Sequence, residues 1–146
     1  MPHLNDQEKI ALSHKVWKNI GIIFSLTIKV DSKELISNTK ITGLEHLKKV
    51  HANGRGLILI SAHIGTWDAM CAKIGNSIAK CDGVVRHVNN PFLNKRIQRI
   101  RLKVFNVITK NSSAALKMLR SVNKENIICM LSDQKMWGTY QSPILW

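Results

Sequence analysis

The chain has 146 residues, enough for one modest domain with a single hydrophobic core. Hydrophobic residues make up 45% and charged residues 21%, a composition that excludes a largely disordered chain. The formal net charge of +13 favours anionic partners, among them nucleic acid, an anionic membrane surface, phosphorylated lipid and an acidic carrier protein.

The N-terminal segment predicts a helix from about Asp6 to Phe24, preceded by Asn5. The first residues are polar and lack the apolar stretch of a secretory signal. The most apolar early run, Ile20 to Val30, is interrupted by polar residues and is shorter than the roughly 20 apolar residues of a membrane-spanning helix. Any contact with a membrane is therefore expected to be peripheral.

The rest of the chain alternates helical and strand patterns. Helices are expected over about 44–50, 66–80, 92–104 and 112–123, and strands over about 56–62, 83–88, 105–108 and 126–131. The first and last strands are nearly continuous apolar runs, which is typical of strands buried on both faces. This alternation predicts an α/β fold with a mostly parallel sheet and helical crossovers.

In parallel sheets the functional groups gather at the carboxyl ends of the strands. Three polar clusters follow expected strands: residues 63–68, 86–90 and 133–134. In the first, His63 leaves a buried strand and Asp68 begins the next helix, so the carboxylate can fold back onto the imidazole as a base dyad. His3 and Glu8 share this spacing, however, and a buried His bonded to the backbone fits equally well.

The other two clusters each allow two interpretations. Arg86 can bind a phosphate or stabilise an oxyanion, or it is a surface residue beside a turn formed by Asn89 and Asn90. Asp133 can place a second carboxylate near His63, or it caps a turn.

The expected helix 92–104 has a basic face. Its apolar residues lie on one side, and on the other lie Lys95, Arg96, Arg99 and Lys103. This face suits anionic lipid head groups or an acidic acyl carrier protein, although a solvated helix surface is the commoner outcome.

The three cysteines match no metal-ligand spacing, so no metal site and no cofactor are expected. Each lies in or beside an apolar stretch and is expected to be a buried, reduced thiol, which suits a cytosol-facing compartment.

In this order, five stretches resemble the lipid A biosynthesis (lauroyl/myristoyl) acyltransferases, a branch of the lysophospholipid acyltransferase superfamily. They are ITGLEHL (41–47), LILISAHIGTWD (57–68), VVRHVNNPFLNKRIQRIR (84–101), VITKNSSAALKMLR (107–120) and LSDQK (131–135).

The resemblance implies a glycerolipid-acyltransferase-like fold and specific roles. His63 would be the general base with Asp68 as its carboxylate partner, and Arg86 and Asp133 would complete the polar site. The donor would be an acyl chain on acyl carrier protein and the acceptor a phosphorylated glycolipid, at the cytoplasmic face of the bacterial inner membrane. Candidate substrate-binding residues are Asn89, Asn90, Lys95, Arg96, Arg99 and Lys103.

The chain also departs from the family pattern. Where Asp68 stands, this branch usually has Glu. Members begin with a membrane anchor and continue well beyond the Asp-Gln motif, so we expect a domain over 1–136 that is incomplete at both ends. Three aromatic residues crowd into 137–146, which suggests an atypical tail produced by a frameshift.

The alternative is a non-catalytic basic protein that binds an anionic membrane surface or nucleic acid. Nucleic acid is not expected, because aromatic residues make up 5% of the chain and none interleaves with the basic face.

Overall fold

A computed structural model describes residues 4–133. The sheet has four strands, all paired in parallel, in the order β1-β4-β2-β3. The strands are β1 (Leu57–Ser61), β2 (Cys81–Val85), β3 (Asn106–Thr109) and β4 (Ile127–Leu131). The helices are α1 (Asp6–Ile28), α2 (Lys33–Asn38), α3 (Leu44–His51), α4 (Trp67–Ser77), α5 (Pro91–Arg101) and α6 (Ala114–Val122). The predicted parallel α/β fold is confirmed.

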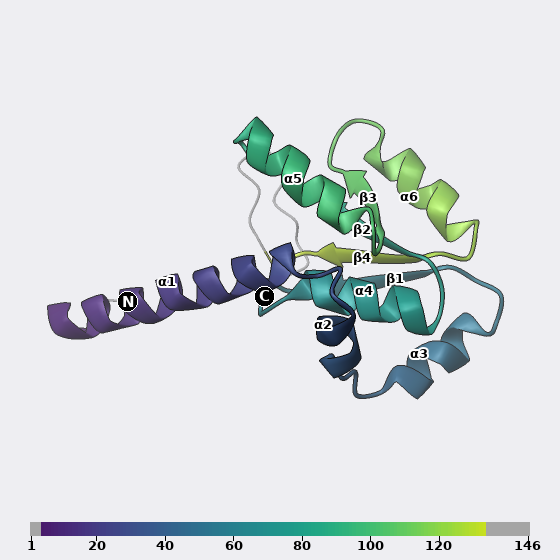
Figure 1. Ribbon diagram of the computed structural model, residues 1–146. Helices are drawn as coiled ribbons and strands as arrows, with labels where there is room; N and C mark the ends of the chain where they lie inside the picture. Colours follow the sequence, from purple (N-terminus) through teal and green to yellow (C-terminus); the bar gives the residue numbers. More distant parts are fainter. Residues whose placement is uncertain (1–3, 134–146) are drawn as a thin grey trace.

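The N-terminal helix α1 projects from the body of the molecule (Figure 1). It begins with a capping box, in which the Asn5 side chain accepts from the Glu8 N–H and the Glu8 carboxylate accepts from the Asn5 N–H. The helix is longer than expected and continues to Ile28. Among residues 4–133, no helix combines the length and the apolar character needed to cross a bilayer.

Two apolar layers hold the sheet. On the face covered by α4, the core contains Ile74, Phe105 and Ile127. On the opposite face, α6 packs over Val84, Ile108 and Ile128. These layers form because alternate residues of each strand point to opposite faces.

The expectation that β1 is buried on both faces is wrong. Ile58 and Ile60 are exposed, while Leu57 and Leu59 pack toward α4. The register pairs Ile58 with Ile128, so Ile58 and Ile60 point to the face that carries α6. Since β1 is an edge strand and α6 packs over β3 and β4, no helix within residues 4–133 covers this part of the sheet.

Candidate active site

The carboxyl ends of β1 and β4 bring His63 and Asp133 together. Ser61 pairs with Leu131 in the sheet register, and each of the two functional residues follows two positions later. The Ser132 N–H donates to the Ser61 carbonyl at 3.1 Å and extends the pairing past the strand ends. Two side chains 70 residues apart in sequence thus become neighbours.

Asp133 binds His63 through both carboxylate oxygens. Oδ1 lies 2.7 Å from the ring Nδ1, and Oδ2 accepts from the His63 backbone N–H at 2.8 Å. These two hydrogen bonds, the backbone one first, hold the pKa of Asp133 below its usual range. The ring is therefore held at its position and angle by an ionised carboxylate.

This contact fixes the tautomer of His63. An ionised carboxylate can only accept, so in the neutral imidazole Nδ1 carries the proton and Nε2 keeps a lone pair. The His63 side chain is 41% exposed, and no residue of the described chain forms a hydrogen bond with Nε2. The arrangement can take a proton from a hydroxyl group that approaches from solvent.

The expected pairing of His63 with Asp68 is not what the structure shows. Asp68 is 1% exposed, and its Oδ1 accepts from Arg101 Nε at 2.7 Å. Its Oδ2 accepts from Arg101 at 3.1 Å and from the Thr27 hydroxyl at 2.9 Å. The carboxylate lies in the first turn of α4, where it is held among α1, α4 and α5.

Arg101 is the residue that the sequence analysis did not single out. Its guanidinium binds Asp68 in bidentate fashion and lies 5.0 Å from the centre of the Trp67 ring. Arg101 follows Ile97 by four residues, which places it on the docking side of α5 rather than on the basic face. A basic residue on the apolar face of a helix requires an anionic partner inside the protein. The position of Arg101 on that face was therefore the sequence signal that pointed to a buried ion pair.

The turn between His63 and α4 uses Gly65, whose φ of +120° favours glycine.

Gly83 in β2 leaves room for two aromatic rings, because a Cβ there would lie 2.8 Å from Phe105 and 3.0 Å from Trp67. Trp67 packs on Phe105 with ring centres 5.8 Å apart. The sheet surface thus supports the ring on which Arg101 stacks.

The second polar cluster follows β2, which neighbours β4 in the sheet. Arg86 is exposed and forms no ion pair with any residue in the range 4–133. Asn89 is exposed as well, whereas Asn90 caps α5 by accepting from the Leu93 N–H at 3.0 Å. The interpretation of this cluster as a turn therefore holds for Asn90. The roles of Arg86, Asn89 and Asn90 toward a substrate stay predictions.

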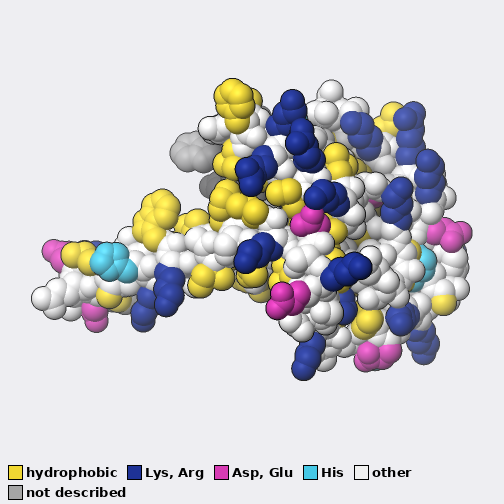
Figure 2. Space-filling model, viewed as in Figure 1, with side chains coloured by type: hydrophobic (Ala, Val, Ile, Leu, Met, Phe, Trp, Pro, Cys, Tyr) yellow, Lys and Arg dark blue, Asp and Glu magenta, His cyan; other side chains and the backbone are white. Residues whose placement is uncertain are grey.

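The basic face of α5 has the predicted orientation. Lys95, Arg96 and Arg99 are exposed and Ile97 is buried. Lys and Arg side chains gather on the surface over α5 (Figure 2). Lys103 lies just beyond α5 and binds Asp31 at 2.7 Å, which lowers the pKa of Asp31. The first three cations are the ones that this face offers to an anionic ligand.

A separate cavity of about 330 Å³ lies at the amino ends of β2 and β3. It is lined by Lys80, Asp82, Asn106, Ile108, Lys117, Arg120, Ser121, Lys124 and Asn126. Buried Asp82 accepts from Asn106, Ser121 and Asn126, so its carboxylate is saturated. Lying at the opposite end of the strands from His63, this cavity is not part of the candidate active site.

The match to known families agrees with this geometry. The model of the bacterial lipid A biosynthesis acyltransferase family matches residues 1–144. A comparison with curated proteins found no significant match. Residues 137–146, expected to be an atypical tail, lie outside the described residues, and the boundary at residue 136 stays a prediction. The chain belongs to the bacterial lipid A biosynthesis acyltransferase family.

Proposed function

We propose that the chain transfers a fatty acyl group from acyl carrier protein to a hydroxyl group of a lipid A precursor, with His63 as general base. The observation that supports this most is the His63–Asp133 hydrogen bond at the carboxyl edge of a parallel sheet. It leaves Nε2 with a lone pair on an accessible ring.

In the proposed reaction the acyl group passes from the thioester to the acceptor hydroxyl without a covalent enzyme intermediate. Nε2 of His63 takes the proton as the acceptor oxygen attacks the thioester carbonyl, and a C–O bond forms. The tetrahedral intermediate collapses with cleavage of the C–S bond, and the leaving thiolate takes the proton from the imidazolium. Asp133 stabilises the imidazolium between these two steps through its bond to Nδ1. These reaction steps require no cofactor.

Arg86 is proposed to bind an anionic oxygen of the substrates. It follows β2, and β2 neighbours the strand that ends before Asp133. Its guanidinium is exposed and not engaged by a described acidic residue, so it can form a bidentate contact with a phosphate. Asn89, which is exposed on the same segment, is the proposed polar neighbour.

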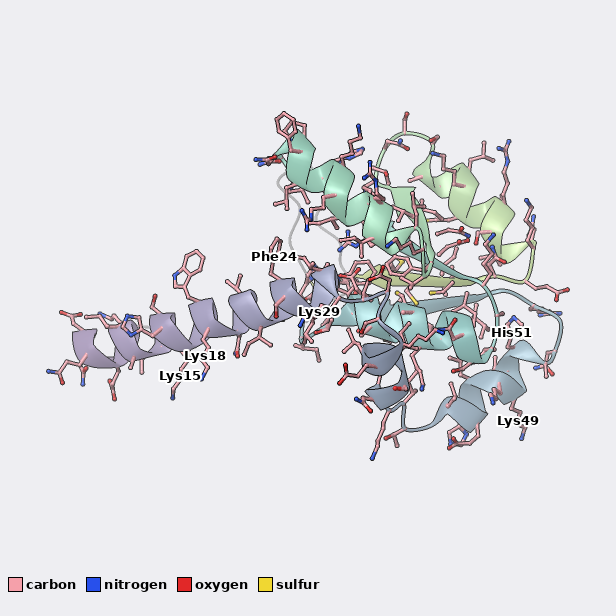
Figure 3. The ribbon with its side chains drawn as sticks, in the orientation of Figure 1. Lys15, Lys18, Phe24, Lys29, Lys49 and His51 are labelled. Carbon is pink, nitrogen blue, oxygen red and sulfur yellow. The ribbon has the colours of Figure 1, made fainter. Side chains whose placement is uncertain are left out.

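The acyl carrier protein is proposed to approach the basic face of α5. This surface presents Lys95, Arg96 and Arg99 on the helix that follows the carboxyl end of β2. Charge reversal at Arg96 and Arg99 should raise the KM for acyl carrier protein and weaken its salt dependence, with less effect on kcat. Charge reversal at Lys49 of α3 is the matched control, because that lysine is also exposed but lies on a different helix (Figure 3).

We also propose that the chain binds the cytoplasmic face of the inner membrane peripherally, through α1. Val16, Trp17, Ile20 and Phe24 are exposed and fall within an arc of about 100° on the helix. Lys15 and Lys18 extend from the opposite side to Phe24 (Figure 3). In the proposed contact these apolar side chains enter the acyl region of the membrane interface and the lysines bind anionic head groups.

Vesicle sedimentation tests this membrane proposal. Binding should be stronger with phosphatidylglycerol vesicles than with phosphatidylcholine vesicles, and Trp17→Ala should weaken it. Val50→Ala, an exposed apolar residue on α3, is the control and should leave binding unchanged. Equal binding by Trp17→Ala and the native sequence would remove α1 from the membrane contact.

Catalysis is tested by acyl transfer from acyl carrier protein to a lipid A precursor, with the product identified by mass spectrometry. His63→Ala should lower the rate of transfer by about 10²–10⁴-fold. His46→Ala is the matched control, because that side chain is exposed and, within residues 4–133, pairs with the neighbouring Glu45 at 3.6 Å. Equal rates for His63→Ala and the native sequence would remove His63 from the mechanism.

A further inference from the structure

The side chains of the three cysteines meet in the core. They are buried, whereas the proposed catalytic dyad of His63 and Asp133 is partly exposed. Cys71 comes from α4, Cys81 from β2 and Cys129 from β4. All three are buried, with exposed fractions of 0%, 1% and 1%. Their Sγ atoms all lie within 4.8 Å of one another.

We propose that Cys71, Cys81 and Cys129 form a trigonal all-sulfur site for one soft metal ion of the monovalent copper type. Among the described residues, these cysteines form the one set of three or more His, Cys, Asp or Glu side chains whose ligand atoms lie close enough together to hold one ion. Thiolate sulfur selects soft ions such as Cu(I) over the hard ions that prefer oxygen.

The sulfur separations fit three-coordinate binding. Metal–sulfur bonds of about 2.3 Å in a plane place the sulfurs about 4 Å apart. Cys81 and Cys129 are 3.4 Å apart, and the other separations are no longer than 4.8 Å, so none exceeds the required spacing by more than about 1 Å. Small rotations of the three side chains bring the sulfurs to equal distances from an ion at their centre.

The surroundings limit the ion to these three ligands. The cluster is enclosed by apolar side chains that include Ile74, Phe105 and Ile127. Zinc usually completes a tetrahedron with a fourth ligand or a water molecule, and burial to 1% exposure or less leaves water no access. An ion that accepts three sulfurs suits this environment better.

Competition with a chromophoric Cu(I) chelator under anaerobic conditions tests the site. The full chain should withdraw about one Cu(I) ion and develop ultraviolet sulfur-to-copper charge-transfer absorption. Cys71→Ser, Cys81→Ser and Cys129→Ser should each lower the affinity at least tenfold. Ile74→Val, which trims the same apolar cluster and keeps all three sulfurs, should retain binding.

X-ray absorption of the copper-loaded native chain gives a second measurement that does not depend on how the variants fold. Three sulfur neighbours at about 2.3 Å support the site. Two sulfurs, or nitrogen and oxygen neighbours, would overturn it. Failure of the native chain to compete with the chelator, or equal competition by the serine variants, would overturn it as well.

Discussion

Two aspartates lie near the carboxyl edge of the sheet, and their surroundings differ in almost every respect. Asp133 is partly exposed and binds a partly exposed histidine. Asp68 is 1% exposed and binds Arg101 and Thr27 at the junction of three helices. A carboxylate beside an accessible imidazole can assist proton transfer, whereas a buried carboxylate that is saturated by donors holds elements together. These surroundings fit the proposed catalytic role of Asp133 and a structural role for Asp68.

The largest expected effect is on catalysis at the exposed region. His63→Ala should lower the rate of acyl transfer by about 10²–10⁴-fold, the usual contribution of a positioned general base. Because the side chain is 41% exposed, the free energy of unfolding should change by no more than about 0.5 kcal/mol. Steady-state kinetics measures the rate of acyl transfer, and urea unfolding measures the free energy of unfolding. A large loss of stability would show that His63 is a structural residue.

The next effect is on stability at the buried region. Asp68→Ala leaves the Arg101 guanidinium without its partner, and it should lower the free energy of unfolding by about 3–5 kcal/mol. Asp6→Ala is the matched control, since Asp6 forms an exposed ion pair with Lys9 and its loss should cost about 0–1 kcal/mol. Urea unfolding followed by circular dichroism measures both. Similar midpoints for the two variants would contradict a structural role for Asp68.

Replacing both members of the buried pair sharpens the test. Asp68→Leu combined with Arg101→Met removes the two charges together, so no unpaired charge is left inside. The double variant should be more stable than Asp68→Ala. If it is less stable than either single variant, the pair contributes more than the cancellation of charge.

A smaller effect is expected at Thr27, which ties α1 to the buried carboxylate. Thr27→Val removes the hydroxyl that donates to Asp68 and keeps the shape of the side chain. The free energy of unfolding should fall by about 0.5–1.5 kcal/mol. Thermal unfolding measures this, and Thr39→Val at the end of α2 is a control with a local hydrogen bond to Leu35. No change at Thr27 would mean that Arg101 alone satisfies Asp68.

The smallest effect concerns the pH dependence of stability. The folded pKa of Asp133 is depressed, so its contribution is present above the unfolded value of about 3.9 and is lost as pH falls through the lower folded value. Asp133→Asn should therefore flatten the loss of stability below about pH 4. Urea midpoints across this range measure it. Identical pH slopes for the variant and the native chain would mean that the His63 contact does not stabilise the carboxylate.

The fold was largely predictable from the sequence because its strands and helices carry clear periodicity. The segment 126–131 is a continuous apolar run and becomes β4, and the face of α5 that carries Ile97 is buried as its pattern indicates. Helix α2 escaped prediction because it has six residues, too few to show a period. The exposure of Ile60 also escaped, because the order of strands in a sheet decides which one lies at the edge.

Both Asp68 and Asp133 were expected near His63, and the structure brings Asp133 to the imidazole while Asp68 binds Arg101. His63, Asp68 and Asp133 were all singled out, but the short spacing pointed to Asp68 as the partner of the imidazole. The actual partner is 70 residues away and is brought near by the register of β1 and β4. Local spacing cannot reveal such a contact. Arg101 was missed although its position on the apolar face of α5 was a signal. The meeting of Cys81 and Cys129, 48 residues apart, likewise depends on strand order.

The most direct test of the central claim is a kinetic double-mutant cycle that compares the two aspartates at equal concentrations of folded protein. Because His63 and Asp133 are proposed to act as a unit, adding Asp133→Asn to His63→Ala should cause no further loss of acyl transfer. Asp68→Asn alone should retain most of the rate per folded molecule. The account is contradicted if Asp68→Asn abolishes transfer in folded protein and shows this non-additivity with His63, while Asp133→Asn leaves the rate unchanged.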